Sequence, residues 1–261
     1  MPTGERDAYA ELLDRIIKVD DQAIRNFRTS IKSILYKYRD ELEKYADRKG
    51  EINRSKLRKL MNEIDSVSDE YGEVLYEESA SSMETAAKIV VAYMVAELGL
   101  RFISEPMRRS ELEDSLRYID GLSVRDRTVL IAGTLADKVR TEVRRGVYNG
   151  DSVNAIYSDI SDLIDDEEWQ SRRVISSEVN NTMRLQVGDV LAENGDVYCQ
   201  FYESELCTHR NHNRHRCHLL AKENRYGLGA GVFKLTDMEI YFPHPQCRGY
   251  IGRWSGSGDD E

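Results

Sequence analysis

The chain has 261 residues, of which 40% are hydrophobic and 32% are charged, and its formal net charge at pH 7 is −10. This length and apolar content suffice for one sizeable core or two small ones, and a uniformly acidic chain would argue against nucleic-acid binding. The most apolar run, residues 89–100, is too short to cross a bilayer, so no membrane partner is expected.

The first part of the sequence predicts long amphipathic helices. Within residues 7–47, apolar residues recur with a spacing of three or four, for example at Ile24, Phe27 and Ile31. A second run of this kind covers residues 57–74, and a third, more apolar helix is expected over residues 82–103. The pattern favours a helical hairpin within one bundle, and self-association through these N-terminal helices is the alternative.

A polar connection with Pro106 leads into a second helical region. Ser123 and Asp126 have the spacing of a capping box, and Gly150 suits the end of the helix that they begin. Asp151 or Ser152 then caps a helix with an apolar face over residues 153–163. A further helix is expected over residues 167–194, closed by Gly195. In it Arg172, Glu178 and Arg184 have spacings that suit ion pairs at a surface or interface.

The residue pattern changes after Gly195 from helical periodicity to that of strands and loops. Residues 196–202 alternate and predict a strand, residues 224–233 form a glycine-rich loop, and a short strand follows the two prolines near residue 244. The predicted fold class is therefore mainly α, with a long helical N-terminal body and a small α+β C-terminal module that contains cysteine and histidine. The expected ranges are a helical N-terminal region over 1–105, a second helical region over 106–195, the small module over 196–253 and a disordered acidic tail over 254–261.

All the cysteines and histidines lie in the last quarter of the chain. Because Met1 is followed by polar and acidic residues, we expect no signal peptide, and cysteines of a reducing compartment favour metal binding over disulfides. Zinc takes four sulfur or nitrogen ligands, often as two pairs from separate turns. The predicted ligands are Cys207, Cys217, His244 and Cys247, and the candidates to replace one cysteine are His212, His215 and His218. The alternative is that the thiols are simply buried, as expected for Cys199 within its strand, and that the histidines are solvated.

The same module is mildly basic. From Cys199 to Arg253 there are eight lysines and arginines against five acids, a formal net charge of +3. Arginines alternate with the histidines of residues 209–218, which predicts a basic loop suited to weak, salt-sensitive phosphate contacts. The candidate nucleic-acid contacts are Arg210, Arg214, Arg216 and Arg248. A solvated loop without a ligand is the alternative.

Three segments occur in a characteristic order. The first covers residues 121–160 and begins GLSVRDRTVL, and the second is RRVISSEVNNTMRLQ (172–186). The third joins CHLLAKENRYGLGAGVF (217–233) to FPHPQCRGYIGRW (242–254). Together they resemble the minor head protein family of tailed phages, the phage Mu F-like head morphogenesis proteins, over residues 120–253. The resemblance implies a virion protein that acts in head assembly, genome packaging or delivery at the portal vertex, and that is found in the host cytoplasm during assembly. The implied partners are the portal protein, the major capsid protein and, through the basic loop, packaged DNA.

Two features depart from the family pattern. Cys207 and Cys217 are ten residues apart, whereas family members place two cysteines closer together, and Ser176-Ser177-Glu178 stands where the family has Arg-Thr-Glu. Other interpretations are a metal-dependent nuclease or toxin-like domain on a helical body, and a zinc-binding adaptor unrelated to a virus. Few acids accompany the histidines, and a divalent nuclease metal prefers oxygen ligands. We therefore expect no enzymatic activity.

Overall fold

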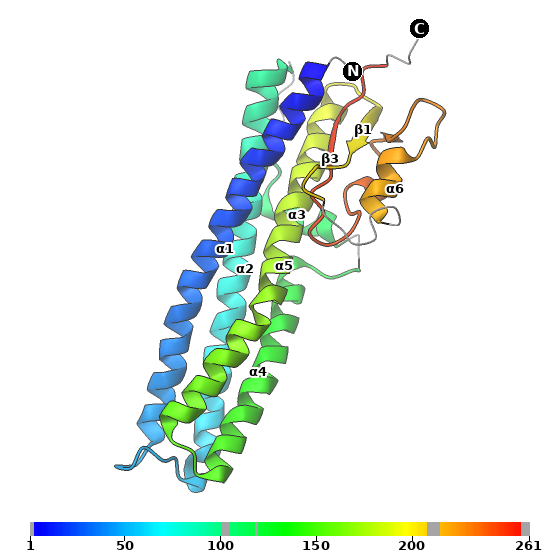
Figure 1. The fold of residues 1–261 in the computed structure, drawn as a ribbon. Helices are drawn as coiled ribbons and strands as arrows, with labels where there is room; N and C mark the ends of the chain where they lie inside the picture. Colours follow the sequence, from blue (N-terminus) through cyan, green and yellow to red (C-terminus); the bar gives the residue numbers. More distant parts are fainter. Residues whose placement is uncertain (1–2, 101–104, 118–119, 208–214, 257–261) are drawn as a thin grey trace. The chain divides into compact units, whose positions relative to one another are not determined.

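The computed structural model describes residues 3–100, 105–117, 120–207 and 215–256. It confirms a mainly α fold with a small antiparallel sheet near the C-terminus (Figure 1). The elements in chain order are α1 (Thr3–Tyr45), η1 (Arg54–Lys56), α2 (Leu57–Leu98), α3 (Arg109–Leu116), α4 (Val124–Asn149), α5 (Val153–Glu193), β1 (Tyr198–Tyr202), α6 (Arg216–Lys222), β2 (Val232–Lys234), η3 (Met238–Ile240) and β3 (Tyr250–Arg253). Within the described residues no helix combines the length and apolar character needed to span a membrane.

Several predicted element boundaries are wrong. The helices predicted over 57–74 and 82–103 are one helix, α2, and those predicted over 153–163 and 167–194 are also one helix, α5. Neither junction contains a proline or glycine, so nothing in the backbone interrupts the hydrogen-bond ladder, and the polar residues there lie on the helix surface. The polar connection predicted after residue 105 contains α3, and the end of the predicted basic loop forms α6.

The chain divides into two compact units, which are described separately. The helical unit comprises Ala23–Ser79 and Leu122–Ile175, and the sheet-bearing unit comprises Met1–Gln22, Ala80–Gly121 and Ser176–Glu261. Helices α1, α2 and α5 each contribute residues to both units. The ranges predicted from the sequence, 1–105, 106–195, 196–253 and 254–261, stay predictions, and residues 257–261 of the predicted tail lie outside the described residues.

The helical unit has a core of aliphatic and aromatic side chains from α1, α2, α4 and α5. Phe27 meets Tyr71 edge to face, with ring centroids 5.6 Å apart, and the Tyr71 hydroxyl lies 2.8 Å from the Ser171 hydroxyl. The predicted capping of α4 is confirmed, because the side chains and amides of Ser123 and Asp126 bond reciprocally and Gly150 ends the helix with φ = 77°.

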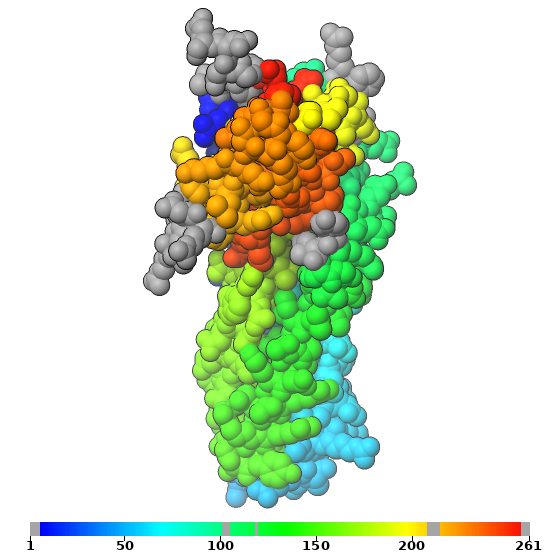
Figure 2. Space-filling model, turned by 90° about the vertical axis from the view of Figure 1, so that its right-hand side faces the viewer, coloured from blue at the N-terminus to red at the C-terminus, as the bar shows by residue number. Residues whose placement is uncertain are grey.

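The sheet-bearing unit contains a three-stranded antiparallel sheet in the order β2-β1-β3. Cys199 is fully buried in the central strand, where it pairs with Phe233 and Arg253, as expected for a small buried hydrophobic residue. Gly188 of α5 leaves room for Tyr241, because a Cβ at Gly188 would lie 2.3 Å from the tyrosine hydroxyl. The residues after Gly195, coloured yellow to red in Figure 2, gather in one continuous cluster.

Candidate metal centre

The candidate metal centre is a cluster of thiols and imidazoles in the sheet-bearing unit. Cys207 follows β1, Cys217 lies in α6, and Cys247 lies in the turn before β3, and all three are buried. Ligand atoms of Cys207 and Cys217 lie within 4.8 Å of each other, as do those of Cys217 and His244, and Cys247 follows His244 in the same turn, where it interacts electrostatically with Cys217 and His244. The four residues predicted as zinc ligands are therefore neighbours in the fold, although they come from three separate segments. Their role as ligands stays a prediction.

A second imidazole joins this cluster. His215 Nδ1 lies 3.4 Å from Cys217 Sγ, and the His215 ring centroid lies 4.1 Å from that of His244. Ligand atoms of His215, Cys217 and His244 all lie within 4.8 Å of one another, and so do those of Glu203, Cys207 and Cys217. Four ligands around one zinc ion are about 3.3–3.8 Å apart. The cluster could therefore hold a metal ion after small side-chain movements, with His215 as a further donor.

The electrostatics of the cluster favour negative charge on two of its three thiols. The hydrogen bond from Cys217 lowers the pKa of Cys207, and the same donor, aided by His244 and Arg184, lowers the pKa of Cys247 to about 4. Cys217 itself has a raised pKa, because it donates to both neighbours. Burial acts to lower the pKa of His244, but the hydrogen bond to Cys247, the charge of Cys247 and the Pro245 carbonyl together raise that pKa above its ordinary value. Such a site suits a divalent cation, which displaces the thiol protons on binding.

Arg184 ties the turn that carries Cys247 to helix α5. Its side chain is 1% exposed, and it donates from Nε to the Tyr241 carbonyl at 2.8 Å. Its Nη1 donates to the carbonyls of Cys247 at 3.0 Å and Gly249 at 2.7 Å, and its Nη2 donates to Asn181 Oδ1 at 2.6 Å. Each of these acceptors is uncharged. The guanidinium therefore satisfies its hydrogen bonds here without a carboxylate among these partners.

The charge of Arg184 complements the cysteine cluster. Burial lowers its pKa, whereas the negative charge of Cys247, Cys207 and Cys217 acts to raise it. Three thiolates around a divalent ion carry a net charge of −1, which one buried guanidinium balances. The prediction of Arg184 and Glu178 as surface or interface residues is wrong, since they are only 1% and 2% exposed. The signal was available: Arg184 is the single charge in the ten-residue stretch 179–188, which otherwise contains only apolar, amide, hydroxyl and glycine residues.

The turn from His244 to Cys247 has the geometry of a constrained ligand loop. The Cys247 amide donates to the His244 carbonyl at 3.2 Å, and Gln246 has φ = 56°, a left-handed conformation that is uncommon for residues other than glycine. The Gln246 amide donates to Ser177 Oγ at 3.0 Å, which holds the turn against α5. The Gly249 amide donates to Cys247 Sγ at 3.3 Å, a contact that stabilises a thiolate.

The other predicted site residues have different surroundings. His218 Nδ1 lies 2.8 Å from Glu203 Oε2, so this histidine is held by a carboxylate at the edge of the cluster. Arg248 lies 3.8 Å from the buried carboxylate of Asp20, and Arg216 is exposed on α6. The remaining candidates, His212, Arg210 and Arg214, lie outside the described residues.

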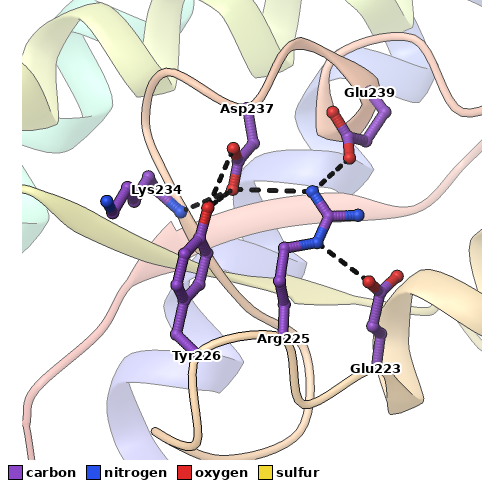
Figure 3. Close-up of polar contacts among 6 residues, drawn as sticks. All are labelled: Glu223, Arg225, Tyr226, Lys234, Asp237 and Glu239. Carbon is purple, nitrogen blue, oxygen red and sulfur yellow. Dashed lines mark hydrogen bonds and ion pairs between the residues drawn. The ribbon is translucent and has the colours of Figure 1, made fainter.

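The late acidic residues of the module belong to a separate network around Arg225. Arg225 Nε donates to Glu223 at 2.9 Å, and its Nη1 is paired with Glu239 and lies 3.8 Å from Asp237 (Figure 3). The Tyr226 hydroxyl donates to Asp237 at 2.9 Å. These carboxylates fasten the glycine-rich loop to the segment after β2, and their partners are basic and phenolic groups of the protein.

Comparisons with protein-family models, with curated proteins and with solved structures find no match for this chain.

Proposed function

We propose that this chain is a structural protein of a tailed-virus particle, similar to the minor head proteins, whose C-terminal module is closed by one zinc ion. The observation that carries the zinc proposal is the cluster of three buried thiols with the half-buried His244, backed by the buried guanidinium of Arg184, whose charge the cluster complements. Structural zinc sites use four protein ligands and leave no open position, whereas catalytic sites keep one for water. A cluster with this many protein donors and this little exposure supports a structural role.

The virion assignment rests on the order of the three sequence segments and on the His244–Arg248 motif in particular. The architecture is compatible with it, because a long helical body and a small clasped module suit assembly with other proteins. The proposed partners are the portal protein and the major capsid protein, and the proposed location is the head near the portal vertex.

Metal content tests the zinc proposal directly. Elemental analysis of the purified protein is expected to give one zinc per chain, and Cys217→Ser is expected to lose it. Cys199→Ser is the matched control, because Cys199 is equally buried but pairs within the sheet. A protein without metal, or a Cys217→Ser variant that keeps it, contradicts the proposal.

Co-sedimentation tests the virion proposal separately. The protein is expected to sediment with portal assemblies or procapsids, and failure to do so at every salt concentration contradicts the assignment even if zinc is present. That second outcome would favour a zinc-binding adaptor unrelated to a virus.

The rival function is a metal-dependent nuclease. The observation in its favour is the Glu203–His218 pair, because a carboxylate–histidine pair beside a metal is a recurrent catalytic arrangement. Against it, Glu223, Asp237 and Glu239 are engaged by Arg225. Incubation with DNA and RNA in the presence of Mg²⁺, Mn²⁺ or Zn²⁺ decides between the two: cleavage that His218→Ala abolishes would establish the nuclease.

A further inference from the structure

The helical unit has a strongly basic end, although the chain as a whole is acidic. Residues 48–62 hold six lysines and arginines and one acid, Glu51, a formal net charge of +5 in a chain of −10. This segment contains the turn after α1, then η1 and the start of α2. It meets the end of α4, because Arg54 donates to the Tyr148 carbonyl at 2.7 Å, and the start of α5, because the Val153 amide donates to the Gly50 carbonyl at 2.9 Å.

A groove of about 460 Å³ lies at this end of the helical unit. Two arginines from the first segment, Arg54 and Arg58, and two from α4, Arg140 and Arg144, line it. Leu57, Met61, Asn62 and Asp65 complete the lining. Arg140 and Arg144 are four residues apart on α4, so they repeat at about 6 Å along its axis, and Arg54 and Arg58 are likewise four residues apart across the junction of η1 and α2. The result is two rows of guanidinium groups on one groove.

Most of this positive charge is not neutralised within the protein. Asp65 and Asp137 pair with Arg140. Arg54 bonds to a backbone carbonyl and lies over the Tyr148 ring, 5.0 Å from its centroid. Among the described residues, no carboxylate pairs with Arg58 or Arg144, both of which are exposed. Like charges held this close repel one another, and an anion in the groove would relieve that repulsion.

The two grooves that α2 lines differ in charge. A second groove of the same unit, where α2 faces α1, is lined mainly by acids: Asp40, Glu41, Glu43, Glu63 and Glu70, with Lys37, Lys44, Ser66 and Val67. Helix α2 therefore presents a basic face toward α4 and an acidic face toward α1. Charges farther away than about 8 Å are largely screened at physiological salt, so a polyanion would respond to the local arginines rather than to the net charge.

We propose that the groove formed by η1, the start of α2 and the C-terminal part of α4 binds the phosphate backbone of duplex DNA. Arginine is suited to phosphate because its planar fork donates two parallel hydrogen bonds. The groove offers charge and few groups able to distinguish bases, so binding is independent of sequence. This inference goes beyond the virion proposal and requires no metal.

Fluorescence anisotropy with a labelled duplex oligonucleotide, measured between 50 and 200 mM salt, tests the proposal in the full-length protein. R58Q/R144Q is expected to weaken binding about tenfold at low salt and to reduce the slope of log K against log salt by about 2, one unit for each lost phosphate contact. R58K/R144K keeps the charges and is expected to retain most of the affinity. The matched control is K32Q/K88Q, which removes two exposed lysines outside the groove.

Three results would overturn the proposal. One is unchanged binding by R58Q/R144Q when its thermal unfolding matches that of the parent protein. Another is loss of binding only in R210Q/R214Q, which would place the contact in the C-terminal module. The third is equal affinity for polyglutamate of the same charge, which would show a general polyanion surface rather than a site for nucleic acid.

Discussion

The two units of this protein bury polar groups of different kinds. In the helical unit, the buried polar residues among those described are all hydroxyls: Ser68, Ser79, Ser123, Thr128 and Ser171. In the sheet-bearing unit they include charges and amides, namely Asp20, Glu178, Asn180, Asn181, Arg184, Gln186 and His218, together with four hydroxyl residues. The hydroxyls of the helical unit bond within one helix or to a buried tyrosine, whereas the sheet-bearing unit also buries ionisable and amide side chains.

The two kinds of buried group differ in how much stability is lost when a hydrogen-bond partner is removed. A buried hydroxyl can bond to its own helix, as Thr128 does to the Arg125 carbonyl at 2.8 Å, and then needs no partner from a distant segment. A buried charge needs several partners placed by distant segments, as Arg184 has, and is costly when one is removed. We therefore expect loss of one buried hydroxyl partner to cost the helical unit little stability. Loss of the metal or of the Arg184 charge is expected to destabilise the sheet-bearing unit strongly.

Removal of the metal is expected to produce the largest difference in stability between the two units. A chelator, or Cys217→Ser, is expected to unfold residues 198–253 while residues 124–149 stay protected, because structural zinc contributes about 10 kcal/mol or more to small zinc modules. Hydrogen exchange with peptide-level resolution measures both regions in one experiment. Cys199→Ser, which keeps the cluster, should leave the exchange of residues 198–253 close to that of the parent protein. Equal loss of protection in both regions would show that the units are not energetically distinct.

Arg184→Met should have the next largest effect. It keeps most of the side-chain volume but leaves the carbonyls of Tyr241, Cys247 and Gly249 without their donor, and a loss of about 3–5 kcal/mol is expected. Urea unfolding measures the change in stability, and competition with a colorimetric zinc chelator measures the affinity. Arg172→Met is the control, because Arg172 is exposed on the same helix. A loss below 1 kcal/mol for Arg184→Met would contradict the role assigned to it.

Sequence patterns predicted the helices, helix ends and strand that are determined by residues close together in the sequence. Periodicity gave the helical character, Ser123 and Gly150 gave both ends of α4, and alternation gave β1. Sequence patterns predicted false boundaries within α2 and α5, because polar residues there suggested a break although no proline or glycine lies at either junction. They also could not identify the partners of Arg184, which are carbonyls 57 to 65 residues away along the chain.

The sequence could predict which residues form the candidate site, but it could not predict which side chains contact one another there. The clustering of cysteine and histidine in the last quarter pointed to Cys207, Cys217, His244 and Cys247. Spacing could not reveal that His215 approaches the cluster while His218 turns to Glu203, because α6 begins between them and sends the two rings in different directions.

A smaller test concerns the helical unit alone. Tyr71→Phe is expected to cost about 1–2 kcal/mol, because it leaves the buried Ser171 hydroxyl without its partner while preserving the ring contact with Phe27. Tyr36→Phe is the matched control, since Tyr36 is 62% exposed, and should change stability by less than about 0.5 kcal/mol. Thermal unfolding of both variants measures the difference. The zinc content should stay at the parent level in each, and a loss of zinc in Tyr71→Phe would refute the independence of the two interiors.

The smallest expected effect is at the turn after α1, where an exposed carboxylate organises the backbone. Asp47 Oδ1 accepts hydrogen bonds from the amides of Glu51 and Lys49 at 3.1 and 2.8 Å, and these lower its pKa from 3.8. Because the folded pKa is depressed, the carboxylate contributes stability above the unfolded value, and this contribution is lost as pH falls through the folded pKa. Amide chemical shifts of Lys49 and Glu51, followed from pH 6 to pH 2, should therefore change with a midpoint below 3.8. Asp47→Asn should abolish that transition, and a midpoint at or above the ordinary value would show that the two hydrogen bonds do not favour the charged form.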